Sequence, residues 1–415
     1  MATSGSYNLN ATGLDILTES LGLVGFYSPG ESLDNTEVAD GLRSLEFMLK
    51  ANQQRWGVHL NKELSLIFQN DTIRYSIGPT GDHCAENMVK TELAADAASA
   101  ATSITIDATT GMTDSFDRDG ILASSTPSGA GALTLNGALV TSGIATLTSN
   151  RKALVYSDGN DAGVTFTITG QNTIGTAVTE VLTGPNTTTV YSANEYRTIS
   201  SIAISGAGTG NIEIGQVGDH IGIELDSDDM QWTNIGNALS TTTTLIAALT
   251  GAAATDNHVY SYKIKSERPT LITEARLHRS DDLERPIIIV GRADYQLLSN
   301  KTNEAPVNQI WYDGQLTNGV ATVWPEPDDV QDWIKFTGRY PIQDVDSTAN
   351  NLEVAQEWYE PIAWQLAVRL FPKYNKGAAC SRPFKADADE FLAEAMATDS
   401  NNDPVFIKMA PNHGR

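Results

Sequence analysis

The side chains that most often carry out catalysis or hold metals are scattered along this chain. Its two cysteines, Cys84 and Cys380, lie far apart and form no metal-type spacing. They predict neither a zinc site nor a disulfide framework, but two free thiols in a protein made in a reducing cytoplasm. No two of the histidines share a metal-ligand spacing, so we interpret each as a surface or hydrogen-bonded residue: His59, His83, His220, His258, His278 and His413. We therefore expect no metal and no cofactor.

The chain also lacks the short motifs of the common enzyme classes. It has no nucleophile elbow, no zinc-protease helix motif and no phosphate-binding loop. The glycine run at 206–210 stands between two predicted strands, which favours a hairpin. Residues 117–120 match part of a calcium loop but lack its later ligands, so we predict a solvated turn. Asp226, Asp228 and Asp229 form a second acidic turn, for which a weak cation site is the alternative.

The charge of the chain limits its partners. Its 27 Lys and Arg are outnumbered by 51 Asp and Glu, which gives a formal net charge of −24. Such a chain does not present the basic face with which proteins grip nucleic-acid phosphates, although DNA can pass it without being held. No basic and apolar leader opens the sequence, and no run reaches 18 apolar residues, so we expect neither a secretory signal nor a membrane span.

Residues 119–215 differ from the sequence on both sides and are interpreted as an inserted domain. Charged residues are few there, and short alternating runs of Thr, Ser, Gly, Ala and Val dominate. About seven short strands with Gly, Asn and Ser turns predict a β-sandwich. The flanking strands at 102–107 and 220–225 are expected to belong to one β unit that the insert interrupts, because insertion succeeds where two chain ends lie close together.

The outer segments predict helices. Thr12 with Asp15, and Asp34 with Glu37, have the spacing of capping boxes, and Gly57 marks a helix end. The second helix carries an apolar stripe that we expect to find a neighbouring subunit, because an αα-hairpin cannot bury it alone: Val38, Leu42, Leu45, Leu49 and Trp56. Two further helices are predicted near the C-terminus, one containing Pro361 and one over 386–397.

Strands are predicted between these helical ends. Residues 64–68 and 73–77 have the pattern of a hairpin, as do 309–312 and 319–324. Other strands are expected at 231–235, 244–248, 259–264, 286–290 and 333–340. The predicted class is α+β, with an N-terminal αα-hairpin and C-terminal helices packed with a mixed β body. The expected domains are a core of 1–118 and 216–398, the insert 119–215, and a tail 399–415.

Outside the insert, the order and spacing of several segments resemble the head-to-tail adaptor of short-tailed and related tailed phages, a tail accessory factor that docks beneath the portal ring. The resemblance covers 14–118 and 216–395 and is carried by residues 45–60, 64–68, 74–79, 287–295, 308–313, 319–327, 356–358 and 366–370. The insert is similar to an immunoglobulin-like module of phage structural proteins, through 167–170, 177–185 and 190–192. None of these motifs is catalytic.

The resemblance implies a virion protein at the head–tail junction, made in the host cytoplasm. It implies a ring, of twelve copies in this family, which binds the portal, extends the DNA channel and offers a platform to downstream tail or nozzle proteins. Genomic double-stranded DNA would pass the lumen without specific binding, since acidic walls repel phosphate. Leu42, Leu45, Leu49 and Trp56 would then form a subunit interface, as the contacts of a ring require.

Three points stay open at this stage. Val405, Phe406 and Ile407 would anchor a portal-binding tail by the same resemblance, whereas disorder is the ordinary state of a terminal segment. The first alternative function is a virion-associated peptidoglycan hydrolase, because a carboxylate pair needs only spatial proximity and the sequence singles out none. The second is a host-surface or glycan-binding tail protein that acts through the insert. We expect no enzyme activity.

Overall fold

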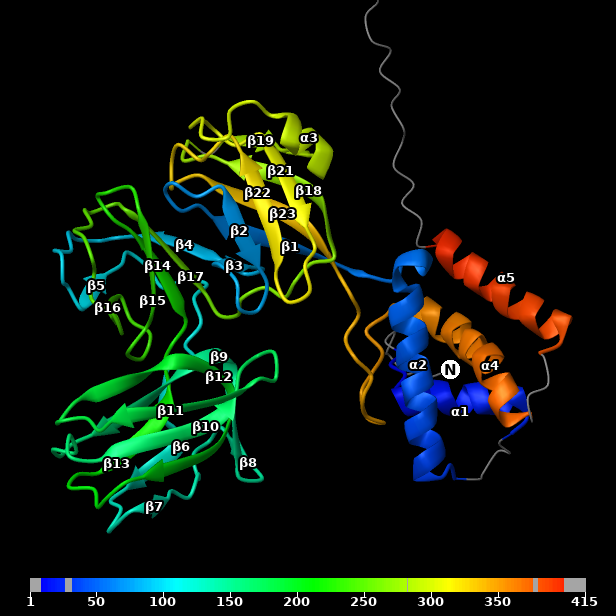
Figure 1. The fold of residues 1–415 in the computed structure, drawn as a ribbon, viewed down its shortest axis with the longest axis horizontal. Coiled ribbons are helices and arrows are strands. Elements are labelled where there is room, and N and C mark those ends of the chain that lie inside the picture. The colour runs from blue at the N-terminus through cyan, green and yellow to red at the C-terminus, as the bar shows by residue number, and fades with distance from the viewer. Residues whose placement is uncertain (1–8, 27–31, 282, 376–379, 399–415) are drawn as a thin grey trace, which may run out of the picture. The chain divides into compact units, whose positions relative to one another are not determined.

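A computed structural model describes residues 9–26, 32–281, 283–375 and 380–398. Helices and several β-sheets both contribute to it, which confirms the predicted α+β class (Figure 1). The chain divides into two compact units. The helical unit comprises Met1–Leu60 and Pro341–Arg415, and the β unit comprises Asn61–Tyr340. This boundary differs from the expected domain limits, because strands β1 and β23 at its two edges pack within the β unit.

Both N-terminal helices begin at the residues that the capping patterns predict, and α2 ends at the predicted Gly57. Helix α1 spans Gly13–Val24, and the Thr12 backbone N–H donates to Asp15 Oδ2 at 2.9 Å. Helix α2 spans Asn35–Trp56, and the Asp34 backbone N–H donates to Glu37 Oε2 at 3.1 Å. Gly57 ends α2 in the left-handed conformation, with φ 79°, which a residue with a Cβ adopts only under strain. The turn between these helices lies outside the described residues.

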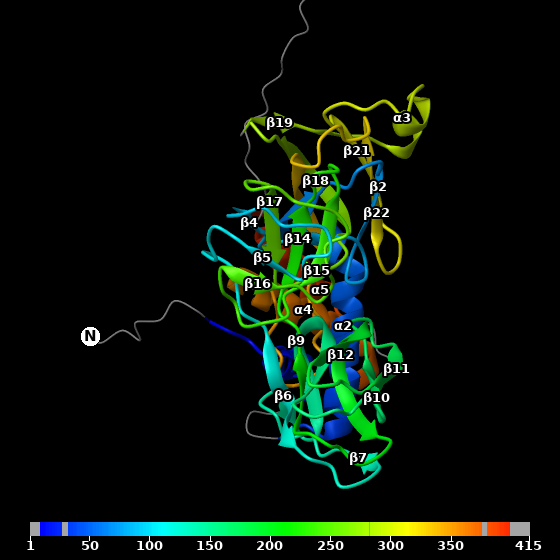
Figure 2. The same ribbon diagram turned by 90° about the vertical axis from the view of Figure 1, so that its left-hand side faces the viewer.

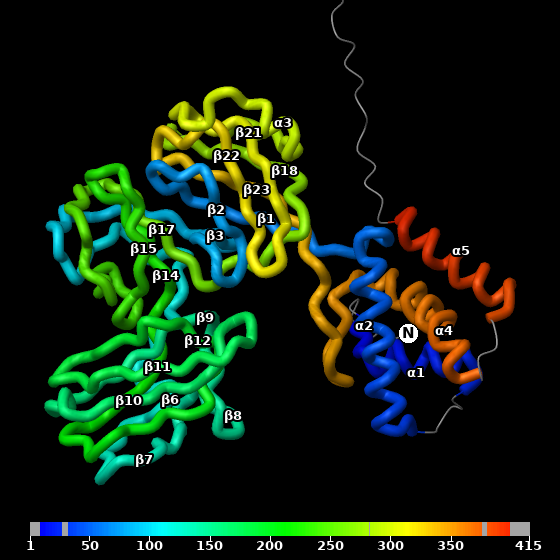
Figure 3. The backbone as a smooth tube through the Cα atoms, in the orientation of Figure 1, coloured from blue at the N-terminus to red at the C-terminus, as the bar shows by residue number. Residues whose placement is uncertain are grey.

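The C-terminal segment supplies the other half of the helical unit. A short 3-10 helix, Gln356–Trp358, leads into α4, Tyr359–Tyr374, and α5 spans Arg382–Thr398. Pro361 lies in the first turn of α4, where its missing N–H has no partner to lose. The Ser20 hydroxyl of α1 donates to the Ala363 carbonyl of α4 at 2.9 Å. Figure 3 traces the blue N-terminal helices beside the orange and red C-terminal ones, so both chain ends build one core.

Two sheets of the β unit draw on strands from both sides of the insert. The first has the order β19-β18-β23-β1-β3, with β19 Glu284–Pro286, β18 Leu271–His278, β23 Trp333–Tyr340, β1 Leu60–Ile67 and β3 Cys84–Ala85. The second has the order β2-β22-β21-β20, with β2 Arg74–Ile77, β22 Gly319–Trp324, β21 Gln309–Asp313 and β20 Ile288–Ile289. Helix α3, Arg292–Leu297, follows β20.

These pairings correct one predicted hairpin and confirm another. Strands β21 and β22 are antiparallel partners, as predicted. The predicted hairpin of 64–68 and 73–77 is wrong, because β1 pairs with β3 whereas β2 pairs with β22. Local alternation identified the strands correctly, but β2 pairs with a strand more than 200 positions away, and β1 lies between β3 and the distant β23.

A four-stranded sheet and a two-stranded sheet flank the insertion point. The larger has the order β15-β14-β17-β4, with β15 Met230–Asn234, β14 His220–Glu224, β17 His258–Tyr262 and β4 Val89–Glu92. The smaller pairs β5, Ser103–Thr105, with β16, Thr242–Thr244. Ile104 and Ile221 are buried in the same apolar cluster. The two flanking segments therefore share a core, although they lie in different sheets.

Residues 117–216 fold as one sheet with its own core (Figures 1 and 2). The order is β11-β10-β12-β9-β13-β6, with β7 pairing β12 and β8 pairing β9. The strands are β6 Asp117–Ser125, β7 Gly131–Ala132, β8 Val140–Thr141, β9 Ile144–Ser157, β10 Thr165–Gln171, β11 Ala177–Thr183, β12 Thr189–Ile204 and β13 Ile212–Gln216. Ile121 of β6 and Phe166 of β10 meet in one cluster, so the sheet curls around that core.

Two loop predictions within the insert are wrong. The glycine run at 206–210 does not close a hairpin, because β9 lies between β12 and β13 in the sheet. Residues 117–120, predicted as a solvated turn, begin strand β6 instead. Gly120 is buried there, and a Cβ on it would approach Asp117 Oδ2 to 2.2 Å. Gly120 therefore lies in a close-packed strand and not in a turn, and a larger residue would displace the Asp117 side chain.

Candidate functional site

The predicted subunit-interface residues lie inside the helical unit. Leu42, Leu45, Leu49 and Trp56 are 7, 0, 2 and 6% exposed, and they pack with residues of α1 and α4. The premise that this stripe lacks a partner within its own chain is therefore wrong. Sequence reasoning counted only the αα-hairpin, whereas α4 comes from more than 300 residues away to cover it. The predicted portal anchors Val405, Phe406 and Ile407 lie outside the described residues.

The most polar interior of the molecule is one face of the four-stranded sheet. Because side chains alternate along a strand, β14 and β17 present Ile221, Ile223 and Val259 to one side, where they join an aliphatic cluster. The opposite face is polar and aromatic, and most of its side chains are buried: His220, Glu224, Met230, Trp232, Asn234, His258, Tyr260 and Tyr262. The polar face of this sheet therefore brings together His, Glu, Asn and Tyr side chains that are far apart in the sequence.

Two histidines meet on this polar face. His83 stacks on Trp232 with ring centroids 4.0 Å apart, and its Nδ1 lies 2.6 Å from the Tyr262 hydroxyl. His220 stacks on Tyr262 at 4.7 Å and bonds Asn234 through Nδ1 at 3.2 Å. Burial lowers the pKa of both histidines well below the usual value, so both are neutral at pH 7. Their ring faces and Nδ1 atoms are occupied by neighbours, which is the arrangement of packed interior histidines.

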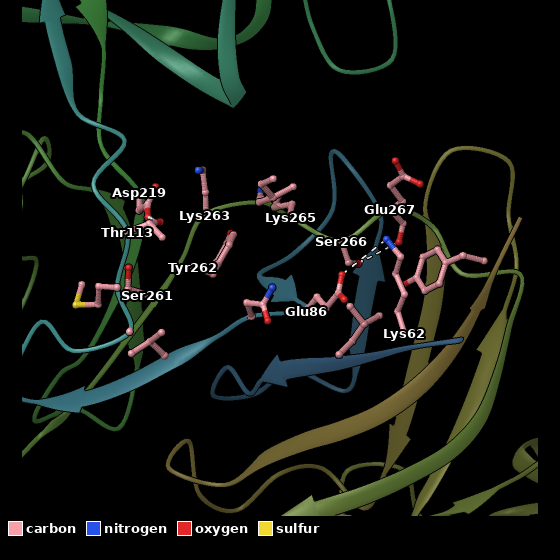
Figure 4. Close-up of a pocket in the computed structure, with 17 residues that line it drawn as sticks. Lys62, Glu86, Thr113, Asp219, Ser261, Tyr262, Lys263, Lys265, Ser266 and Glu267 are labelled. Carbon is pink, nitrogen blue, oxygen red and sulfur yellow. Dashed lines mark hydrogen bonds and ion pairs between the residues drawn. The ribbon is translucent and has the colours of Figure 1, made fainter. Parts of the chain in front are cut away.

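A cavity of about 350 Å³ opens beside this face (Figure 4). In the close-up, Thr113 and Asp219 lie at one end, with Lys263 and Lys265 along the middle and Lys62, Glu86 and Glu267 at the other end. The lining holds as many lysines as carboxylates. It therefore selects neither an anionic nor a cationic ligand strongly.

Several polar groups of this cavity bond one another or nearby backbone carbonyls. Lys62 Nζ lies 3.7 Å from Glu86 Oε2, and Lys265 Nζ donates to the Gly81 carbonyl at 2.9 Å. The Ser261 hydroxyl donates to the His220 carbonyl at 3.0 Å. Cys84, behind the cavity, is buried, and burial raises the pKa of its thiol to about 12. A thiol of that pKa is not a nucleophile at neutral pH.

A buried ion pair joins the insert to the rest of the β unit. Arg151 of β9 donates from Nη2 to Asp219 Oδ1 at 2.6 Å and to the Lys263 carbonyl at 2.5 Å. The two side chains are 0 and 1% exposed, and Thr113 donates to the other Asp219 oxygen. Residues before, within and after the insert therefore meet at one point. No sequence signal marked Arg151, because its partner lies 68 positions away.

The carboxyl group with the most raised pKa lies elsewhere. Asp332 is 1% exposed, and burial raises its pKa to about 6. Its Oδ1 accepts from the Ser280 backbone N–H at 2.9 Å, and Oδ2 lies 3.6 Å from Arg279 Nε. Such a carboxyl is a feature of general acids. Asp332 does not line the cavity beside the polar face of the four-stranded sheet.

The two sequence-based cation candidates do not gather ligands. Within the described ranges, no group of three His, Cys, Asp or Glu residues could hold a metal ion. Asp226 instead accepts from the Ala254 backbone N–H at 2.8 Å, and Asp228 occupies a turn with φ 59°. None of the helices in the described residues has the length and apolar character of a membrane span.

No protein-family model matches this sequence, and no curated protein is significantly similar to it.

Proposed function

We propose that this chain is a head-to-tail connector of a tailed-phage virion. In this proposal its copies form a ring beneath the portal, extend the DNA channel and carry the downstream tail proteins. What carries the proposal is that the segments resembling phage adaptors come from both ends of the chain and meet in one helical core. Residues of α1, α2 and α4 pack there around Leu17, Leu45 and Leu366, each of which is fully buried.

The chemistry of the interior also favours a structural role. The cavity beside the polar face has its lysines and carboxylates paired or balanced, and its neighbouring histidines are neutral and packed. Asp332, whose pKa burial raises, is not one of the lining residues. Nothing in these arrangements favours the hydrolase alternative over a connector.

The burial of the α2 stripe limits which surfaces can form the subunit contacts of a ring. Because the apolar stripe of α2 is used within the chain, subunit contacts in a ring would fall on other surfaces of the two units. Phe47 lies on the outer side of α2 and is 60% exposed, and Phe26 beyond α1 is 42% exposed. Exposed aromatic side chains of this kind are enriched at subunit contacts. We therefore propose that the ring contact lies on surfaces with exposed aromatic side chains, and no longer on the buried stripe of α2.

The test is assembly on the portal of the same phage. Purified chain and purified portal are mixed, and the mass and symmetry of the product are measured by native mass spectrometry and electron microscopy. The proposal expects a closed ring of the chain attached to the portal, with twelve copies as in the family it resembles. If the chain stays unattached at concentrations far above those of an infected cell, the connector function is wrong.

A truncation tests the proposed portal contact separately. Deleting residues 404–415 removes Val405, Phe406 and Ile407 without touching the described helices. We expect portal co-sedimentation to fall, and a variant with these three residues changed to Ser should reproduce the loss. Undiminished co-sedimentation of both variants would remove the tail from the proposal while leaving the connector function standing.

A further inference from the structure

The two edge strands of the insert sheet, β6 and β11, differ in whether other segments bond their outward backbone groups. At the β6 edge, the Leu139 backbone N–H donates to the Gly120 carbonyl at 2.8 Å, and the Asn136 side chain accepts from the Ala123 N–H at 3.0 Å. A loop therefore occupies the hydrogen-bonding groups that this edge would otherwise expose. At the β11 edge, no backbone bond other than those to β10 is made by Ala177–Thr183 within the described part of the chain.

Four other sheet edges in the described residues are covered by a neighbouring segment or are short and charged. The β4 edge is covered, since the Asp107 N–H donates to the Glu92 carbonyl at 3.0 Å, and the β2 edge is covered by Asp82 at 2.6 Å. At the β15 edge the Ile246 N–H donates to the Asn234 carbonyl at 3.1 Å. The β19 edge is three residues long and consists of two charged residues and a proline. Proteins protect edges in these ways because an open edge accepts foreign strands.

The outward face of β11 carries no charge. Ala177, Thr179, Val181 and Thr183 are exposed, and Val181 is 61% exposed. Glu180, the one charged residue of the strand, belongs to the other face. Its carboxylate is turned inward, where Oε1 accepts from the Ala193 N–H at 2.7 Å and Oε2 from the Asn194 N–H at 3.0 Å. These bonds help to lower the pKa of Glu180.

We propose that β11 is a docking edge for β11 of a second copy of this chain. Every copy has a net charge of −24, so a surface free of outward acidic groups lowers the repulsion between two copies. The exposed face of β11 is such a surface. The strand is seven residues long and paired with β10 along its whole length, so its outer edge is a rigid template.

The residue pattern selects an antiparallel register centred on Val181. In this register Val181 faces Val181 of the other copy, and Thr179 faces Thr183 on either side. These are pairs of β-branched residues, which stabilise antiparallel strands. Glu180 faces Leu182 of the other copy, so no two carboxylates oppose each other. A register centred on Glu180 would place two carboxylates opposite one another, which destabilises the pair.

This contact goes beyond the connector proposal and does not depend on it. A two-fold contact closes after two copies, whereas a ring is built from head-to-tail contacts. The β11 contact would therefore join two free chains, or two chains that already belong to rings. It is measured without the portal, so its failure and the failure of the connector function are separate results.

The first experiment is sedimentation of the full chain over a wide concentration range. The wild type should dimerise as concentration rises. Val181→Lys places two lysines opposite each other at the centre of the contact and should raise the dissociation constant at least about tenfold. Ser124→Lys on the exposed surface of β6 adds the same charge to the covered edge and should leave it unchanged. A wild type that is monomeric throughout, or equal effects of the two variants, overturns the proposal.

A second experiment tests the register with cysteines in a Cys380→Ser background, in which the remaining Cys84 is buried. Val181→Cys brings two thiols opposite each other and should give a disulfide-linked dimer under mild oxidation. Thr183→Cys is the matched control, because its thiols would be about 14 Å apart across the same pair of strands. Equal cross-linking of both variants, or cross-linking of Thr183→Cys alone, contradicts the antiparallel register centred on Val181.

Discussion

Helix α2 and strand β11 each carry a row of apolar or uncharged side chains, yet only one row is covered. The α2 residues Leu45 and Leu49 are 0 and 2% exposed, whereas Val181 of β11 is 61% exposed. The α2 stripe was the stronger amphipathic signal, and the chain uses it for its own core. The β11 row gave only a strand signal. An apolar stripe in a sequence thus indicates burial, and the structure decides whether the burial lies within one chain or between two.

The largest effect should come from the ion pair that holds the insert. Arg151→Met leaves Asp219 buried without its cation, which should lower the free energy of unfolding by about 3–5 kcal/mol. Arg118→Met is the control, because it breaks a partly exposed pair with Glu213 and should change the value by about 0–1 kcal/mol. Denaturant unfolding followed by tryptophan fluorescence measures both.

The result of this experiment also bears on β11. If the insert folds around its own core, Arg151→Met should weaken the junction while β11 keeps its dimerisation. The double variant Arg151→Met/Asp219→Leu removes both charges and should recover most of the lost stability. Similar losses for Arg118→Met and Arg151→Met would show that the buried pair has no special part in the stability of the β unit.

The second prediction compares α2 and β11 directly. Leu45→Ala removes a fully buried side chain and should lower the free energy of unfolding by about 2–5 kcal/mol. Val181→Ala on the exposed face of β11 should change it by no more than about 0.5 kcal/mol in the monomer. In sedimentation, Leu45→Ala should keep the dissociation constant of the wild type. If Val181→Ala lowers the free energy of unfolding and Leu45→Ala weakens dimerisation instead, the α2 stripe is an interface and β11 is a core strand.

A smaller, pH-dependent effect should arise from Asp332. Burial raises its folded pKa to about 6, above the ordinary value of 3.8, so the folded state binds the proton more tightly than the unfolded state. Its contribution to stability is therefore greatest below about pH 4 and is lost as pH rises through 6, on the order of 2–3 kcal/mol in total. Asp332→Asn should remove this part of the pH dependence. An unchanged profile between pH 4 and 7 would contradict the assignment.

The sequence predicted the local elements well for physical reasons that are themselves local. Thr12 with Asp15 and Asp34 with Glu37 lie within one helical turn of each other, and each pair caps its helix as predicted. The strand at Trp333–Tyr340 was predicted with the bounds that the structure gives, because its alternating side chains face one core. The hairpin of 309–312 and 319–324 was also predicted correctly, because a short turn joins its two strands.

The errors concern contacts between residues that are distant in sequence. The pairing of β1 with β2 was wrong, because β1 lies between β3 and β23 and β2 pairs with β22, and both β22 and β23 follow more than 200 residues later. The glycine run at 206–210 was taken for a hairpin, since no local pattern reveals that β9 lies between its flanking strands. The cavity and the contact of His83 with His220 could not be predicted either, because His83, before β3, and His220 of β14 come together only in the folded chain.

By itself the sequence determined the α+β class, the helix ends, most strands and the acidic charge, because these depend on neighbouring residues and on composition. Only the tertiary structure decided which apolar rows are covered. Covering Leu45 requires a helix from the far end of the chain, and leaving Val181 open requires that no segment crosses the β11 edge. Both follow from the positions of whole elements in space, which no local pattern of residues encodes.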